Sequence, residues 1–121
     1  MAVTVTNKLI VEVEGLGKLL QFAESWVETT AATAATYNYR TLTTADTAEA
    51  LDLGDVAVVH QIVIKAIGSI YIDTSYVSAF VNEITLHAGE VAVFKPAGTV
   101  YIKNYVALAT PAYEYVLTGT T

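Results

Sequence analysis

The chain has 121 residues and a net charge of −6, and 54% of its residues are hydrophobic against 15% charged. This length suits a single domain over residues 1–121, and the apolar share excludes a disordered chain. Six basic residues supply no basic face to displace phosphate counterions, so we expect no nucleic-acid partner. The absence of cysteine excludes disulfides, thiol catalysis and cysteine-ligated metals.

The first residues carry no recognisable targeting signal. Polar side chains interrupt the segment MAVTVTNKLIVEVEG at every second or third position. No window approaches the ~18 consecutive apolar residues of a transmembrane helix. We therefore expect no membrane partner, and synthesis in the cytoplasm.

The residue types of the first half favour strands, with one exception. Val, Ile and Thr make up about one third of the chain, and their branched Cβ atoms fit a pleated sheet. Residues 3–6 and 9–13 predict strands. In residues 18–27, however, a short helix competes with a strand, because apolar side chains recur there at helical spacing: Leu19, Phe22, Ala23, Trp26 and Val27.

Turn signals then divide the chain into short strands. Residues 29–36, rich in Thr and Ala, predict a loop or a sheet edge, residues 37–42 a strand, and residues 43–54 an acidic connector. Further strands are predicted at 61–66, 70–73, 83–86, 91–95, 100–104 and 112–118. Turn signals every ~8–12 residues predict an all-β chain folded as an antiparallel β-sandwich or barrel. In the turn 87–90, Gly89 is expected to take a positive φ.

No pattern of catalytic or metal-binding residues stands out. His60 and His87 are too far apart in the sequence to form a usual metal motif. Asp52 and Asp55 lack the remaining ligands of a calcium loop. No nucleotide-binding glycine motif or nucleophile elbow occurs. We expect no metal, no cofactor and no enzymatic activity.

Two groups of residues leave alternatives open. Paired carboxylates suggest a glycosidase, whereas solvent-facing surface charges explain them equally well: Glu12, Glu14, Glu24 and Glu28. Tyrosines crowd the last two strands, where they form either aromatic pairs at the edge of the core or a subunit interface, a setting that favours Tyr. The candidate interface residues are Tyr101, Tyr105, Tyr113 and Tyr115.

Several segments between residues 40 and 118 carry a family resemblance. They read TAEALDLGDV at 47–56, IVIKA at 62–66, ITLHAGE at 84–90 with Phe94 after it, VYIK at 100–103 and EYVL at 114–117. Together they resemble small virion structural proteins of tailed bacteriophages, encoded among head and tail genes. The resemblance implies a jelly-roll-like sandwich without catalytic residues that decorates or cements the capsid, commonly as a trimer.

From the resemblance we expect a non-enzymatic capsid decoration protein on the virion surface. Its partners would be the major capsid protein and further copies of itself. Residues 1–39 lie outside the resemblance, and because the Thr/Ala-rich N-terminal third lacks large apolar anchors, we expect residues 1–17 to form a docking arm that orders on binding. The alternative is that residues 1–39 complete the sandwich. Two alternatives stay open: a tail or neck component of the virion, and a carbohydrate-binding β-sandwich module.

Overall fold

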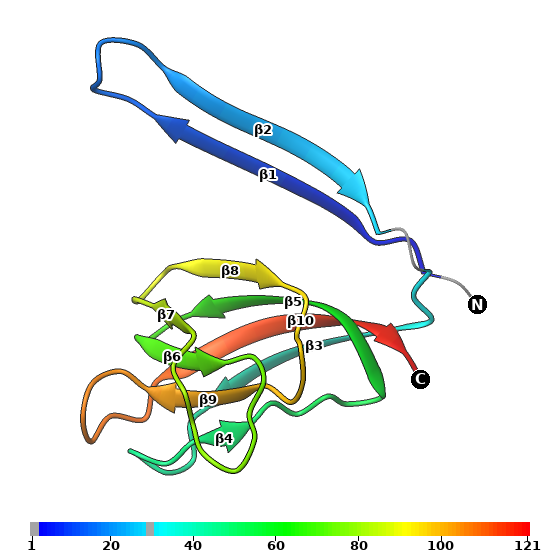
Figure 1. The fold of residues 1–121 in the computed structure, drawn as a ribbon, viewed down its shortest axis with the longest axis vertical. Helices are drawn as coiled ribbons and strands as arrows, with labels where there is room; N and C mark the ends of the chain where they lie inside the picture. The colour runs from blue at the N-terminus through cyan, green and yellow to red at the C-terminus, as the bar shows by residue number, and fades with distance from the viewer. Residues whose placement is uncertain (1–2, 29–30) are drawn as a thin grey trace.

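The computed structural model describes residues 3–28 and 31–121 (Figure 1). Within these residues ten strands form three antiparallel sheets, and no helix is present. The all-β prediction is confirmed. The strands are β1 (Thr6–Val13), β2 (Leu20–Val27), β3 (Ala34–Thr41), β4 (Glu49–Ala50), β5 (Val58–Ala66), β6 (Ile70–Asp73), β7 (Ile84–Leu86), β8 (Val91–Phe94), β9 (Tyr101–Asn104) and β10 (Ala112–Thr120).

Strands β3 to β10 form the body of the molecule, a sandwich of two four-stranded sheets. Sheet I has the strand order β3-β10-β5-β8, and sheet II has the order β4-β9-β6-β7. Neighbours in both sheets run antiparallel, and successive strands alternate between the sheets over much of the body. This order is jelly-roll-like, as expected.

The core lies between the two sheets, because strand geometry sends alternate side chains to opposite faces. Sheet I contributes Ile62, Ile64, Tyr113, Tyr115 and Leu117, each at most 1% exposed. Sheet II contributes Ile70, Ile72 and Ile102, which are fully buried.

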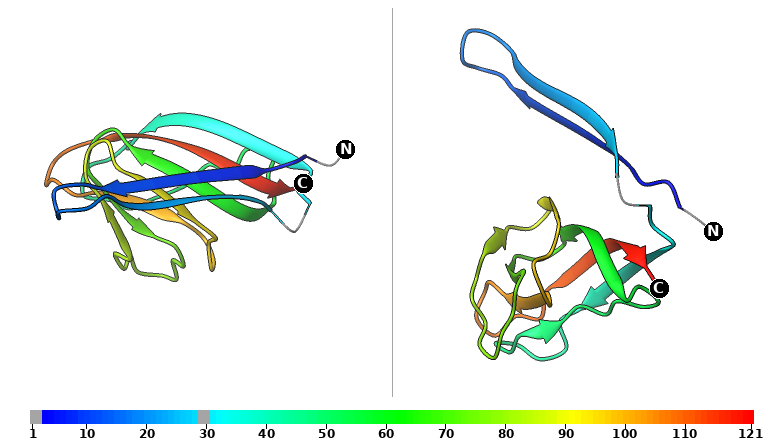
Figure 2. Two further views of the ribbon diagram at one scale, coloured as in Figure 1. Left: turned by 90° about the horizontal axis from the view of Figure 1, so that it is seen from above. Right: turned by 45° about the vertical axis from the view of Figure 1, so that its right-hand side comes forward.

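Strands β1 and β2 form a separate hairpin that projects from the body (Figures 1 and 2). We call residues 6–27 the arm. The helix considered for residues 18–27 is wrong, because residues 20–27 pair with β1 along their whole length, from Leu20 opposite Val13 to Val27 opposite Thr6. Leu20, Phe22 and Trp26 also recur at spacing two, which a strand presents on one face.

The predicted N-terminal boundaries also shift. A single strand spans Thr6–Val13, and Val3 forms only an isolated bridge to Ala32. Of the segment 1–17 for which a docking arm is expected, residues 6–13 form only the first strand of a hairpin that continues to residue 27, and residues 1 and 2 lie outside the described residues. Residues 29 and 30, within the predicted loop or edge of 29–36, also lie outside them. From Ala34 onward that segment is the edge strand β3 of sheet I.

One glycine is required by close packing at the end of β10. The pairing of β10 with β5 shifts register between Thr118 and Gly119. A Cβ atom built on Gly119 would lie 1.9 Å from the carbonyl oxygen of Val58. No side chain fits there unless the two backbones separate.

We expect Gly119→Ala to lower the free energy of unfolding by about 1–3 kcal/mol, because overpacking at a backbone contact forces the strands apart. Urea denaturation measures the change. Gly98→Ala is the matched control, since its Cβ would meet its nearest neighbour, the Cα of Ser75, at 3.5 Å. Equal stability of the two variants would contradict the packing argument.

A second glycine is required by its backbone dihedral. Gly89 has a φ of 88°, which confirms the prediction for the turn between β7 and β8, and nothing lies within 4 Å of its Cβ position. Gly89→Val should therefore cost about 1 kcal/mol or more through backbone strain alone. Gly89→Asn should cost less, because Asn tolerates positive φ. A Val variant that melts at the wild-type temperature would refute this account.

Candidate functional site

One face of the arm is apolar along its length. The β1–β2 register sets Val11 opposite Phe22 and Val13 opposite Leu20, so these four side chains share a face. The full set, which we call the arm face, is Leu9, Val11, Val13, Leu20, Phe22 and Trp26, together with the polar Asn7 and Glu24. Its six apolar side chains are 41–55% exposed. The opposite face carries mainly polar residues, so the arm is an amphipathic hairpin with its apolar side uncovered.

Two polar links hold the base of the arm to the body. The amides of Asn7 and Gln61 each donate to the other over 2.8 Å. The Nζ of Lys95 lies 2.7 Å from a carboxylate oxygen of Glu28, whose side chain is only 6% exposed. Because Asn7 belongs to the arm face and Gln61 to the outer face of sheet I, these links turn the arm face toward sheet I.

Beyond its base the arm rises away from the body. Figures 1 and 2 show it lying over sheet I and diverging from it toward the tip. All residues of β1 and β2 are exposed except Asn7, which is half-buried at the base. The arm face is therefore held above sheet I without packing against it.

The outer face of sheet I is also apolar. The register places Tyr37, Val116, Val63 and Val93 in one row across its four strands. We define the sheet face as this row with Tyr39 and Val91 of the neighbouring row. A hollow of about 190 Å³ lies on it. Between Tyr39 and Val91, the same row contains two oppositely charged residues on adjacent strands, Glu114 and Lys65.

Glu114 is already engaged within the sheet face. The hydroxyl of Tyr37 donates a hydrogen bond to its carboxylate. That bond raises the pKa of Tyr37, because ionisation of the hydroxyl would place a second negative charge beside Glu114. Lys65 is exposed and forms no ion pair within residues 3–28 and 31–121.

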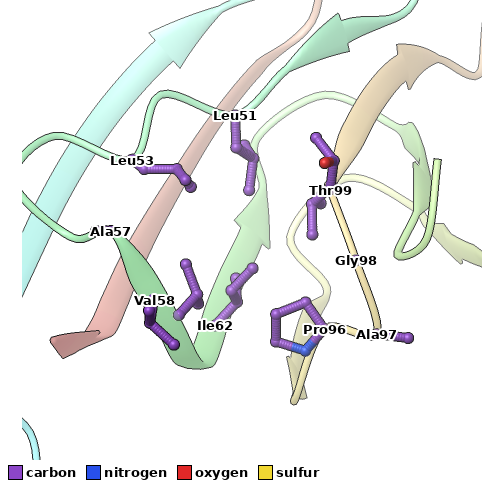
Figure 3. A pocket seen from close by; sticks show the side chains of 11 residues that line it. Leu51, Leu53, Ala57, Val58, Ile62, Pro96, Ala97, Gly98 and Thr99 are labelled. Carbon is purple, nitrogen blue, oxygen red and sulfur yellow. The ribbon is translucent and has the colours of Figure 1, made fainter. Parts of the chain in front are cut away.

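A cavity of about 390 Å³ opens between the sheets beside the β8–β9 loop (Figure 3). Its labelled lining includes Leu51, Leu53, Val58, Ile62 and Pro96, and Thr99 is its one polar side chain among the labelled residues. General acid–base or nucleophilic chemistry requires a titratable or activated group, which this lining lacks. The side chains around the cavity are mainly aliphatic.

The four candidate interface tyrosines differ in how far they are buried. Tyr113 and Tyr115 lie inside the sandwich with ring centroids 5.9 Å apart and are at most 1% exposed. Tyr101 is half-buried beneath Tyr76, whose ring stacks on it at 3.7 Å. Only Tyr105 is well exposed, at 43%.

The interface prediction for Tyr113 and Tyr115 is therefore wrong, because strand alternation points both side chains into the core. Their aromatic pairing there corresponds to the other alternative, and it is central to the core instead of peripheral. Burial raises the pKa of Tyr113 to about 12 and also raises the pKa of Tyr115. Both hydroxyls consequently stay neutral at physiological pH.

The remaining polar candidates are dispersed or have structural partners. Asp52 pairs with Arg40 at 3.0 Å and accepts a hydrogen bond from the N–H of Gly54. Glu28 anchors the arm, and Glu24 projects from the arm face. In the described part of the chain no three His, Asp or Glu side chains come together as a metal site.

The arm face is the feature that the sequence analysis missed. Its signal was present, since Leu9, Val11 and Val13 alternate, and so do Leu20, Phe22 and Trp26. In residues 18–27 that alternation was masked by apolar residues on the other face, Ala23 and Val27, which complete a helical pattern.

Comparisons with protein-family models, with curated proteins and with solved structures find no match to this chain. The described residues also contain no helix long and apolar enough to cross a membrane.

Two substitutions distinguish the buried tyrosine hydroxyls. The Tyr115 hydroxyl donates to the carbonyl oxygen of Asp52 over 2.8 Å, whereas the Tyr113 hydroxyl has no hydrogen-bond partner among the described residues. Tyr115→Phe should lower the free energy of unfolding by about 1 kcal/mol. Tyr113→Phe, the matched control, should cost less because no bond is lost. Thermal or urea unfolding measures both, and a larger loss for Tyr113→Phe would contradict this assignment.

Proposed function

We propose that this protein is a non-enzymatic structural protein that acts by binding other protein subunits, and that the assembly it joins is a bacteriophage capsid. In this proposal it is a decoration protein that binds the major capsid protein on the outside of the particle. The choice of a phage capsid as the assembly rests on the sequence resemblance. The proposal that the protein acts by binding other subunits rests on the exposed apolar face of the arm.

The arm face is the observation that carries the proposal. Soluble chains rarely leave a contiguous apolar patch of several hundred Å² in water unless another surface covers it. Six large apolar side chains on one face of a projecting hairpin form such a patch. A hairpin anchored only at its base can reach across a neighbouring subunit while the sandwich keeps its own fold.

The chemistry of the body agrees with a structural role. Its core is built from aliphatic and tyrosine side chains, the cavity between its sheets is lined mainly by aliphatic side chains, and no three His, Asp or Glu side chains of the described residues come together. The net charge of −6 favours contact with protein over contact with packaged nucleic acid. Binding at many equivalent capsid positions would also multiply weak individual contacts through avidity.

The carbohydrate-binding alternative receives less support from the exposed or half-buried tyrosines among the four interface candidates, Tyr101 and Tyr105. A sugar platform needs a flat, open ring, but Tyr76 covers one side of Tyr101. Tyr105 is exposed, yet it packs against Tyr71 and His87 at centroid distances of 5.1 and 5.0 Å in tilted and edge-on geometries. These rings form a cluster instead of a platform.

The proposal predicts co-sedimentation of the protein with phage capsids that lack it. Phe22→Asp on the arm face should reduce the bound fraction at least about tenfold, because a charge cannot be buried against an apolar surface. Ala23→Asp is the matched control, since it adds the same charge at the next residue on the opposite face, and it should bind like wild type.

Circular dichroism and melting temperature should stay unchanged in both variants, because both positions are exposed. Wild-type protein that does not co-sediment with the capsids would overturn the proposal. Equal binding by the two variants would show that the arm face does not contact the capsid.

A further inference from the structure

We infer that the partner of the arm face is a second copy of this chain: the arm of one copy docks on the sheet face of another. This inference rests on the proposed function and specifies it, since the oligomer so formed would be the unit that binds the capsid. The argument uses the shape, area and charge of the two faces.

The two faces match in kind. Each is a β surface carrying six large apolar side chains, and the arm face holds one charged residue, Glu24. Two β surfaces pack face to face at about 10 Å when their side chains interdigitate. The hollow between Tyr37, Val63, Val91 and Val116 gives the sheet face the relief to receive such side chains.

The areas are sufficient for a stable contact. A fully exposed aromatic side chain presents about 150–250 Å², and Val and Leu present less, so the exposed fractions leave on the order of 400 Å² on each face. A reciprocal pair or a closed ring contains one arm–sheet contact for each arm. Two such contacts together bury about 1,600 Å², the usual size of a specific interface.

The charges are complementary as well. Burying Glu24 requires a cation, because an unpaired buried carboxylate is strongly unfavourable. On the outer face of sheet I, Lys95 already pairs with Glu28, which leaves Lys65. Neither Glu24 nor Lys65 has an ion-pair partner in the part of the chain that the structure describes. Glu114 lies opposite Lys65 in the register but accepts the hydrogen bond from Tyr37, so Lys65 is the cation of the sheet face that can pair with Glu24.

Docking within one chain is disfavoured by the links at the base. The Asn7–Gln61 amide pair and the Glu28–Lys95 ion pair hold the arm where it diverges from its own sheet I. Closure onto that sheet would require the arm to swing about these links. An arm from another copy can approach the sheet face with both links intact.

A charge exchange between copies tests this inference. Wild type at micromolar concentration should have a mass of two or three times 12.9 kDa by light scattering. Glu24→Lys and Lys65→Glu should each raise the dissociation constant at least about tenfold, because each places like charges across the contact. Combining both substitutions in one chain should restore the oligomer, since every arm then finds a sheet face of opposite charge.

Glu12→Lys, on the other face of the arm, is the control and should leave the mass unchanged. A wild-type mass of 12.9 kDa, or single variants that remain oligomeric, would overturn the inference, and so would a double variant that stays dissociated. These outcomes are separate from those for capsid binding. An oligomer that does not co-sediment with capsids contradicts only the proposed function, and a monomer that does so contradicts only the inference.

Discussion

Strand alternation is the constraint on which the rest of this structure depends. In a two-sheet sandwich, one set of alternating side chains fills the core and the other set faces outward. Here the inward set of sheet I, with Ile62, Ile64 and Leu117, completes a closed core. The outward set of the same strands is also largely apolar, so the body finishes folding with an apolar surface still in contact with water.

The arm also leaves an apolar face in contact with water. A two-stranded hairpin has no second layer to cover either face, and isolated hairpins are marginally stable in water. The links from Asn7 and Glu28 fix only its base. The arm thus keeps an apolar face in contact with water, and this is the physical basis of the proposed role in assembly.

Several polar side chains of the body hold loops and connections in place. The ion pair between Arg40 and Asp52 and the bond from Tyr115 to the Asp52 carbonyl hold the β4–β5 connection against β3 and β10. Asp73, at 2% exposure, accepts hydrogen bonds from the N–H groups of Ser75 and Val81, which lower the pKa of its carboxyl and order the β6–β7 loop. Their partners are backbone groups and neighbouring side chains, as expected of residues that maintain a scaffold.

The sequence by itself determined the all-β class, most strands after residue 36 and the turn at Gly89, because these follow from local preferences: branched side chains, period-two alternation and turn residues. It did not determine the state of residues 18–27, since Leu19, Phe22, Ala23, Trp26 and Val27 fit a helix as well as a strand, and only pairing with β1 decides between them. Likewise, alternation placed Tyr113 and Tyr115 on one face, but whether that face is core or surface depends on where sheet II packs. The arm face and the sheet face belong to this second kind of property, because which apolar residues remain uncovered is decided only when all the layers are in place.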